Sequence, residues 1–387
     1  MNRKVGIMTF HESQNYGTVL QAFALQEIIK SLGFEPEIIN YQRNREVLNN
    51  KTNIFKRITS GITAYFGLKI IYYPMIKKFS KSKTYKFSLF RSKYLSYSSA
   101  IYTIYSDLEK CHSQYSAYVC GSDMIWSVDR SENVGIYFLN FAPKEKRIAY
   151  APSFGSNIIS KDLISTYKKY LNEIKYLSCR EISGVNLIKK LTNRDAHLVV
   201  DPTMLIDKDR WKEKFPFMGG ISKPYILCYL FGGVRKEVQP ILNYIKNTLG
   251  LAVRFIPMSV NDFTFNKENN GSGIGPIEFV ELFSEAEFII TNSYHGLLFS
   301  LIFNKSFFII KRNRQSHWAQ FEDRFESLLN TLGLIDRLID PKTDISKMSL
   351  LIDYSNVNKI IEKLRFDSLE FLKNSIENVM RDENENQ

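Results

Sequence analysis

The residues around His295 combine side chains suited to chemistry with an element pattern that would present them. An apolar run at 288–290 predicts a buried strand, a polar turn follows, and an apolar helix is expected from Gly296. This order places Ser293, Tyr294 and His295 at the carboxyl edge of a sheet, where the free N–H groups of a helix start attract anions. An imidazole beside an anion site predicts acid–base chemistry on a phosphorylated or carboxylated substrate. Capping of the helix by His295 is the alternative interpretation.

Other polar tips directly follow predicted strands elsewhere in the chain. They are Asn15, Tyr16 and Gly17; Ser122 and Asp123, after Gly121; Ser153; and Arg180. Because the carboxyl ends of parallel strands share one edge of a sheet, we expect these tips to line a common cleft with His295. Ordinary turn chemistry remains the alternative for any one of them.

The elements that must position these residues alternate between strands and helices. In the first half, strands are predicted at 5–10, 37–41, 117–120, 147–151 and 196–200, with helices at 19–32, 162–174 and 184–191. In the second half, strands are predicted at 225–230, 253–257, 288–290 and 307–310, with helices at 236–249 and 278–284 and from 296. Such alternation favours mostly parallel sheets. The predicted fold is therefore α/β, with two Rossmann-like domains facing a cleft.

The predicted domain limits follow from where the periodicity lapses. Around 211–223 the pattern is lost and Gly219-Gly220 appears, so we divide the chain there. The first domain is expected at 1–215, with an insertion at 43–100, and the second at 222–350. Residues 351–387 are predicted to form an amphipathic helix with a charged tail.

The net charge of +12 is concentrated in one segment, 43–94. That segment also carries aromatic residues, such as Tyr72, Tyr73 and Phe79, between its lysines and arginines. Such a pattern suits docking on an anionic membrane surface. A solvated helical insertion that packs its aromatic residues on the domain explains the pattern equally well. Nucleic acid is a third reading, and we expect no nucleic-acid partner.

Composition narrows the class of protein. Length predicts about two domains for 387 residues, and no uncharged apolar run approaches the roughly 18 residues of a membrane span. The first strand begins almost at the N-terminus, which leaves no room for a signal peptide. The four cysteines lack metal-site spacing and are predicted to be reduced core thiols. We expect a cytoplasmic protein with no metal and no cofactor.

The polar tips belong to longer motifs. These are Gly6-Ile7-Met8-Thr9-Phe10 with Asn15-Tyr16-Gly17-Thr18-Val19-Leu20-Gln21; Tyr118-Val119-Cys120-Gly121-Ser122-Asp123-Met124-Ile125-Trp126; Tyr150-Ala151-Pro152-Ser153-Phe154-Gly155; Arg180-Glu181; Val200-Asp201-Pro202-Thr203; and Thr291-Asn292-Ser293-Tyr294-His295-Gly296, with Phe299-Ser300 and Arg324 downstream. In this order, across most of both predicted domains, they resemble the polysaccharide pyruvyl transferase family. Met124 stands where that family usually has Gln.

The resemblance implies a pair of Rossmann-like domains of glycosyltransferase type B character. It also implies transfer of pyruvate from phosphoenolpyruvate to a pair of hydroxyls on a glycan or lipid-linked saccharide. His295 would be the acid, Asp123 would serve the acceptor, and Arg180 and Arg324 would hold the anionic donor. The further substrate-binding residues implied are Asn15, Tyr16, Gly17, Ser122, Ser153, Ser293, Tyr294 and Gly296. A peripheral position at the inner face of the plasma membrane would suit such an acceptor.

One departure from the family pattern concerns the donor. Better understood members have Arg-Leu-His where this chain has Ser293, Tyr294 and His295. Arg312 or Arg314 is a candidate replacement cation, or each is solvated surface charge. A nucleotide-sugar-dependent glycosyltransferase and a non-catalytic glycan-assembly scaffold remain the alternative functions on the same fold.

Overall fold

The structure is a computed structural model of the 387-residue chain. It describes residues 3–42, 62–127, 134–155, 159–215, 217, 219, 223–232, 235–258, 273–312 and 323–385. Part of the basic segment 43–94 therefore lies outside the described residues, as does Arg314.

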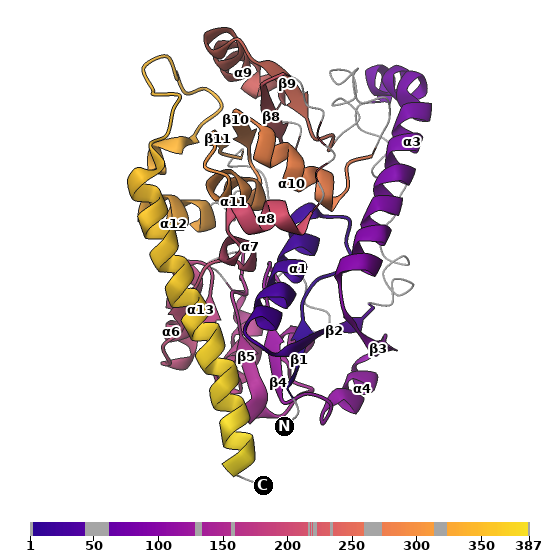
Figure 1. Cartoon of the computed structure of the whole chain (residues 1–387), viewed down its shortest axis with the longest axis vertical. Helices are drawn as coiled ribbons and strands as arrows, with labels where there is room; N and C mark the ends of the chain where they lie inside the picture. Colours follow the sequence, from indigo (N-terminus) through magenta and orange to yellow (C-terminus); the bar gives the residue numbers. More distant parts are fainter. Residues whose placement is uncertain are drawn as a thin grey trace.

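Two parallel five-stranded sheets form the centres of the two halves (Figure 1). The first holds β1 (Lys4–Met8), β2 (Glu35–Tyr41), β3 (Tyr97–Tyr102), β4 (Ala117–Cys120) and β5 (Arg147–Ala149), in the order β3-β2-β1-β4-β5. The second holds β8 (Tyr225–Tyr229), β9 (Ala252–Phe255), β10 (Phe288–Thr291), β11 (Ser306–Ile310) and β12 (Leu338–Ile339), in the order β12-β11-β10-β8-β9. The predicted α/β fold with two parallel sheets is confirmed.

Helices surround both sheets (Figure 1). They are α1 (Tyr16–Ser31), α3 (Ile62–Tyr94), α4 (Tyr105–Leu108), α5 (Ile164–Asn172), α6 (Ile182–Thr192), α7 (Pro202–Leu205), α8 (Lys208–Lys214), α9 (Arg235–Leu249), α10 (Pro276–Glu285), α11 (Tyr294–Ile302), α12 (Asp323–Thr331) and α13 (Tyr354–Glu385). A separate parallel pair, β6 (Ser178–Cys179) and β7 (His197–Leu198), lies beside the first sheet.

Several elements differ from the sequence prediction. Strands β3 and β12 were not predicted, and β3 shows that the last residues of the proposed insertion 43–100 belong to the first sheet. The strand predicted at 196–200 shortens to the exposed β7 outside both large sheets. The lapse in periodicity near 211 is in fact α8, whose Trp211 is fully buried.

The strand order places a crossover point in each sheet. The connections that leave β1 and β4 run to opposite sides of the first sheet, and those that leave β8 and β10 do the same in the second. In open parallel sheets, loops at the carboxyl ends of such strands leave space for functional groups. The segment after β4 holds Asp123, and the turn after β10 leads to His295.

Aromatic side chains join the two halves into one apolar cluster. Tyr16 of α1 stacks on Phe279 of α10, with ring centroids 4.6 Å apart. Trp211 contacts Phe23 on one side, at 5.8 Å, and Phe299 of α11 on the other, at 5.3 Å. Because burial of large rings is strongly favourable, this packing holds α1 against α10 and α11.

Two long helices flank the molecule on opposite sides, α3 and α13 (Figure 1). Helix α3 packs Phe79, Phe87 and Phe90 inward and pairs Lys86 with Glu278 of α10. Helix α13 follows the second sheet in sequence yet returns to the first half, where Ser368 Oγ accepts a hydrogen bond from the Val200 N–H at 2.9 Å. Lys175 also pairs with Asp382 of α13.

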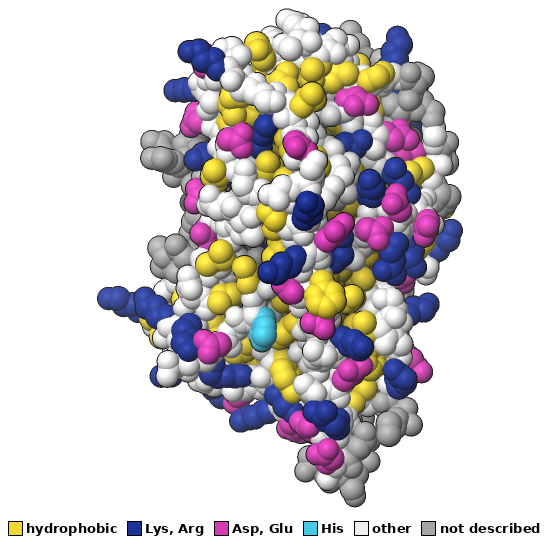
Figure 2. All heavy atoms as spheres, turned by 60° about the vertical axis from the view of Figure 1, so that its left-hand side comes forward, with side chains coloured by type: hydrophobic (Ala, Val, Ile, Leu, Met, Phe, Trp, Pro, Cys, Tyr) yellow, Lys and Arg dark blue, Asp and Glu magenta, His cyan; other side chains and the backbone are white. Residues whose placement is uncertain are grey.

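The surface is mixed in charge on the face that carries α13, where basic and acidic side chains alternate (Figure 2). Within the described residues, no helix combines the length and apolarity needed to cross a membrane. All four cysteines are buried and free, as the sequence predicted.

Candidate active site

His295 is presented by the first turn of α11. Its helix begins at Tyr294 and not at Gly296 as predicted, because Ser293 is the N-cap and its hydroxyl accepts a hydrogen bond from the Gly296 N–H at 3.3 Å. His295 itself is therefore not the cap. Its side chain is buried, with only 8% of the residue exposed.

The His295 ring lies directly against Gly17 of α1. A methyl group at Gly17 would lie 2.1 Å from both Cγ and Nδ1 of the imidazole, a separation that no side chain tolerates. Glycine is therefore required at this close approach between the two halves. The Nε2 atom makes no hydrogen bond within the described part of the chain and faces the carboxylate of Asp201 at 3.7 Å.

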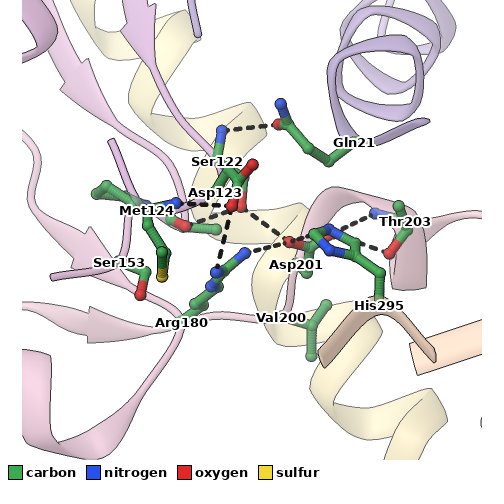
Figure 3. A network of polar contacts seen from close by, with 12 residues as sticks. Gln21, Ser122, Asp123, Met124, Ser153, Arg180, Val200, Asp201, Thr203 and His295 are labelled. Atoms are coloured by element: carbon green, nitrogen blue, oxygen red, sulfur yellow. Dashed lines mark hydrogen bonds and ion pairs between the residues drawn. The ribbon is translucent and has the colours of Figure 1, made fainter. Parts of the chain in front are cut away.

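Asp201 is the centre of a polar network (Figure 3). Its Oδ1 accepts hydrogen bonds from the Thr203 N–H at 3.0 Å and hydroxyl at 2.8 Å. Its Oδ2 accepts from the Ser122 hydroxyl at 2.9 Å and from Arg180 Nη1 at 2.9 Å. Asp201 is fully buried, so these donors compensate the cost of removing its charge from water.

Arg180 points from the end of β6 into this network (Figure 3). Only Nη1 is hydrogen-bonded; Nε and Nη2 have no hydrogen-bond acceptor among the residues that the structure describes. The nearest carboxylate oxygens on that side are Asp123 Oδ1 and Glu181 Oε2, each 3.8 Å away. The Nε–Nη2 edge is the edge that can bind a carboxylate or phosphate with two parallel hydrogen bonds.

Asp123 follows β4 and faces the same guanidinium. Its Oδ2 accepts a hydrogen bond from the Thr18 hydroxyl at 2.6 Å, and its Oδ1 accepts one from the Met124 N–H at 2.8 Å. Burial alone would raise the pKa of Asp123, but Arg180, His295 and the Thr18 hydroxyl together lower it to about 2. This carboxyl is therefore ionised at neutral pH.

Two arginines lie against the Tyr294 ring. The guanidinium of Arg180 lies 4.8 Å from the centre of its ring, and that of Arg324 from α12 lies at 5.2 Å. Burial, and then Arg180 and Arg312, lower the pKa of Arg324 to about 10. Two guanidinium groups thus lie near one aromatic ring, with Arg312 close enough to influence Arg324, an arrangement that an anion would stabilise.

Burial has the largest influence on His295 and lowers the pKa of its imidazole below 6.5. The carboxylates of Asp201 and Asp123 act in the opposite direction without cancelling the effect of burial. The ring is therefore mainly neutral at pH 7. An anion bound beside it would raise its pKa again.

The remaining predicted residues take supporting positions. Ser122 fixes Asp201, and Ser153 accepts a hydrogen bond from the Gly155 N–H at 3.0 Å. Asn15 is exposed and caps α1 by accepting from the Thr18 N–H at 3.4 Å. Gly296 packs against the Thr291 side chain.

Tyr16 was predicted to bind substrate, but in the structure it is part of the aromatic packing. Its ring is fully buried on Phe279, and its hydroxyl donates to the Ile274 carbonyl at 3.2 Å. Substrate contact by Tyr16 remains a prediction.

Sequence reasoning missed the central position of Asp201, together with the supporting roles of Thr18, Gln21 and Thr203. Gln21 contributes by accepting a hydrogen bond from the Ser122 N–H at 3.0 Å. The signal for Asp201 was present as Asp-Pro-Thr at a strand end, since Asp before Pro favours the cap of a short helix. Only the fold shows that this cap lies beside His295.

No group of three or more His, Cys, Asp or Glu residues in the described ranges is arranged to hold a metal ion. The site consists of two arginines, an imidazole and carboxylates, a set suited to binding an anion and moving protons.

Comparison with known proteins identifies a family. Residues 15–314, more than half of the chain, match the family profile described as polysaccharide pyruvyl transferase. Comparison with curated proteins finds no match.

Solved structures with a distantly similar chain trace include MnaA bound to UDP from S. aureus, with 12% identity, a TM-score of 0.47, and coverage of 96% of this chain and 90% of that one. A UDP-GlcNAc 2-epimerase from Methanocaldococcus jannaschii, in complex with UDP-GlcNAc and UDP, has 12% identity, a TM-score of 0.43, and coverage of 94% and 99%. The E. coli heptosyltransferase WaaC has 8% identity, a TM-score of 0.35, and coverage of 81% and 90%. These likenesses are too distant to inform activity or ligands.

Proposed function

Because this chain belongs to the polysaccharide pyruvyl transferase family, we propose that it transfers pyruvate from phosphoenolpyruvate to two hydroxyls of a sugar, forming a ketal. The acceptor would be a glycan or lipid-linked saccharide used for cell-surface or exopolysaccharide synthesis. Such an acceptor fits a cytoplasmic enzyme that works at the inner face of the plasma membrane.

One observation supports the proposal: the buried Nε–Nη2 edge of Arg180, which makes no hydrogen bond in the described part of the chain and faces carboxylates only at 3.8 Å, lies in the same network as His295 Nε2, which makes none either. A buried guanidinium edge without hydrogen bonds is costly unless a ligand completes it. The edge matches a phosphate or carboxylate, and phosphoenolpyruvate carries both. An imidazole next to such an anion can deliver a proton to the adjacent carbon.

The proposed reaction begins with protonation of the donor methylene carbon by His295. The resulting oxocarbenium-like centre is attacked by one sugar hydroxyl, whose proton passes to Asp123. Donor binding prepares this step, because the negative charge of the donor raises the pKa of His295 towards the protonated form. Phosphate then leaves, and the second hydroxyl closes the ketal.

The donor site lacks the arginine that better understood members carry in place of Ser293. Arg312 is well placed to supply that cation, since its Nη2 donates to the Asn292 carbonyl at 2.9 Å, beside the cap of α11. We propose that Arg312, Arg324 and Arg180 share the donor charge. The predicted division into a first domain at 1–215 on the acceptor side, a second at 222–350 on the donor side and a C-terminal helix at 351–387 is part of the same proposal.

The test is incubation with phosphoenolpyruvate and a panel of lipid-linked and nitrophenyl sugars. Release of inorganic phosphate together with a product heavier by one pyruvate ketal is the expected result. A parallel panel of nucleotide sugars tests the alternative of glycosyl transfer. Glycosyl transfer without any ketal product would refute the proposed donor.

The role of Asp123 is tested separately by Asp123→Asn. If Asp123 serves the acceptor, the rate falls while calorimetry shows nearly unchanged binding of phosphoenolpyruvate. Loss of donor binding would move Asp123 to the donor site.

A further inference from the structure

Glu181 is a buried carboxyl at the candidate site to which the proposed reaction has so far given no role. Only 3% of the residue is exposed. Its Oε1 accepts a hydrogen bond from the Phe154 N–H at 2.9 Å, which fixes the side chain. Its Oε2 has no hydrogen-bond partner in the described ranges and lies 3.8 Å from Arg180 Nε, at the edge of that guanidinium that makes no hydrogen bond.

Charged and titratable groups from several elements surround Glu181. They are Arg180, the preceding residue; Arg324 of α12; and, as groups whose own titration Glu181 influences, Cys179 of β6 and Tyr294 of α11. Burial dominates and raises the pKa of the Glu181 carboxyl above its usual value, although the arginines and the Ser153 hydroxyl act against it. Asp201, by contrast, has both oxygens occupied by donors.

The reaction proposed above needs a second proton donor. His295 supplies the proton that turns the methylene into a methyl group, but the carbon–oxygen bond to phosphate must also break. The electron pair of that bond goes to the bridging oxygen, and a proton delivered there makes phosphate a better leaving group. An anion that binds the buried Nε–Nη2 edge of Arg180 would place its oxygens next to Glu181 Oε2.

We propose that Glu181 is the acid that protonates the departing phosphate, a role that rests on the proposed function. After the first hydroxyl has added, the bond from carbon to the phosphate oxygen breaks and Glu181 gives its proton to that oxygen. The second hydroxyl then bonds to the same carbon, and its proton returns to Glu181. The proton taken up by Asp123 from the first hydroxyl balances the one given by His295, and the proton of the second hydroxyl restores Glu181, so no further reactant is needed once Asp123 has passed its proton back to His295.

The experiment compares Glu181→Gln with the wild type. Glutamine keeps the acceptor for the Phe154 N–H and carries no charge, but it cannot deliver a proton. We expect kcat to fall at least about a hundredfold while the Kd for phosphoenolpyruvate, measured by calorimetry, changes less than about threefold. Because His295 is intact, rapid-quench phosphorus NMR should show a phosphorylated adduct accumulating in a single turnover.

Glu281→Gln is the matched control. Glu281 is also a buried glutamate, 7% exposed, whose Oε1 accepts a backbone hydrogen bond, from the Gly219 N–H at 3.0 Å. This variant should keep wild-type kcat and show no adduct.

The outcomes separate this inference from the proposed function. If none of the acceptors in the panel makes the wild type release phosphate from phosphoenolpyruvate, the proposed function fails, and the role of Glu181 fails with it. If the wild type is active and Glu181→Gln keeps its kcat, or loses donor binding without accumulating an adduct, only the Glu181 inference is wrong. Should the Gln variant fold poorly, the pH profile of His295→Gln decides, because that variant lacks the imidazole titration: its residual kcat should still decline as rising pH removes the Glu181 proton, and a flat profile would overturn the assignment.

Discussion

At the scale of the residue, His295 is the group on which the proposed chemistry depends. Replacement by Gln keeps a polar side chain of similar reach but removes the titrating nitrogen. We expect His295→Gln to lower kcat about a hundredfold or more, since general acid catalysis contributes roughly 10² to 10⁴. Far-ultraviolet circular dichroism and thermal unfolding should show a folded protein. The exposed His112 provides the control, and His112→Gln should keep full activity.

The pH dependence of the rate shows whether His295 acts as an acid or as a base. Burial lowers the pKa of His295 in the free protein, so the protonated fraction grows as the pH falls from 8 towards 6. If His295 is an acid, kcat/KM rises over this range with falling pH, and the His295→Gln variant loses that dependence. If kcat/KM instead rises with pH, and this rise is lost in His295→Gln, His295 acts as a base.

The proposed binding of the donor by Arg180 can be tested with a single substitution. Lysine keeps the positive charge but loses the planar fork, so Arg180→Lys should mainly raise the donor Kd, by about tenfold or more. Asp201 would also lose one of its hydrogen bonds, so the thermal midpoint must be recorded alongside. An unchanged donor Kd in a folded variant would show that the open edge of Arg180 does not bind the donor.

At the scale of the element, the approach of α1 to α11 is set by Gly17. Alanine normally stabilises a helix relative to glycine, by about 0.5–1 kcal/mol. Here the added methyl would overlap the His295 ring, so Gly17→Ala should displace the imidazole and lower kcat strongly. Steady-state kinetics with a thermal unfolding curve measures both effects. Full activity in a stable variant would mean that the position of the imidazole is not critical.

The two faces of helix α3 bear on the two interpretations of the basic segment, packing on the domain and docking on a membrane. Phe79, Phe87 and Phe90 pack inward, which agrees with the structural reading for these three aromatic residues. Lys83 also lies on the inner side, 4.5 Å from the centre of the Tyr16 ring, and its burial lowers its pKa to about 8. The outer face keeps exposed lysines and the exposed Tyr73 and Tyr85.

Membrane docking of the outer face of α3 remains a prediction. Each Lys near an anionic surface contributes about 1 kcal/mol. Charge reversal at Lys77, Lys78 and Lys81 should therefore abolish flotation with anionic vesicles at low salt. The matched control reverses Lys359, Lys363 and Lys373, which are exposed on α13. Equal flotation of the wild type with neutral and anionic vesicles would refute docking.

At the scale of the whole molecule, the return of α13 joins the C-terminal segment to the first half. Leu372 is fully buried, and Arg365 Nε donates to the Met204 carbonyl at 2.7 Å, close to the segment that holds Asp201. Truncating a buried Leu to Ala costs about 2–5 kcal/mol, so Leu372→Ala should lower the free energy of unfolding by that amount. The exposed Leu351 is the control for the same substitution, and its variant should unfold like the wild type. Urea unfolding measures both; equal stability of the two variants would show that α13 contributes little to the fold.

The sequence by itself determined the class of fold and the main strands and helices around the site, because both are local properties. Hydrophobic runs and helical periodicity predicted the central strands β1, β4, β8 and β10 and the helices between them. Edge strands β3 and β12 were not predicted because β3 is partly exposed and β12 is only two residues long, and because pairing with β2 and β11 defines them. The start of α11 was misplaced because Ser293 is its cap and Tyr294 begins it.

The tertiary structure decided which polar residues meet. Sequence order cannot show that Asp201, a cap of a short helix, lies beside both Arg180 and His295, because these contacts join distant segments from the two halves. Nor can it show that Tyr16 turns into the aromatic packing while its neighbour Gly17 touches the imidazole. Side-chain type and strand position set the candidates, but burial, the free edge of Arg180 and the carboxylates around it exist only once both sheets are assembled.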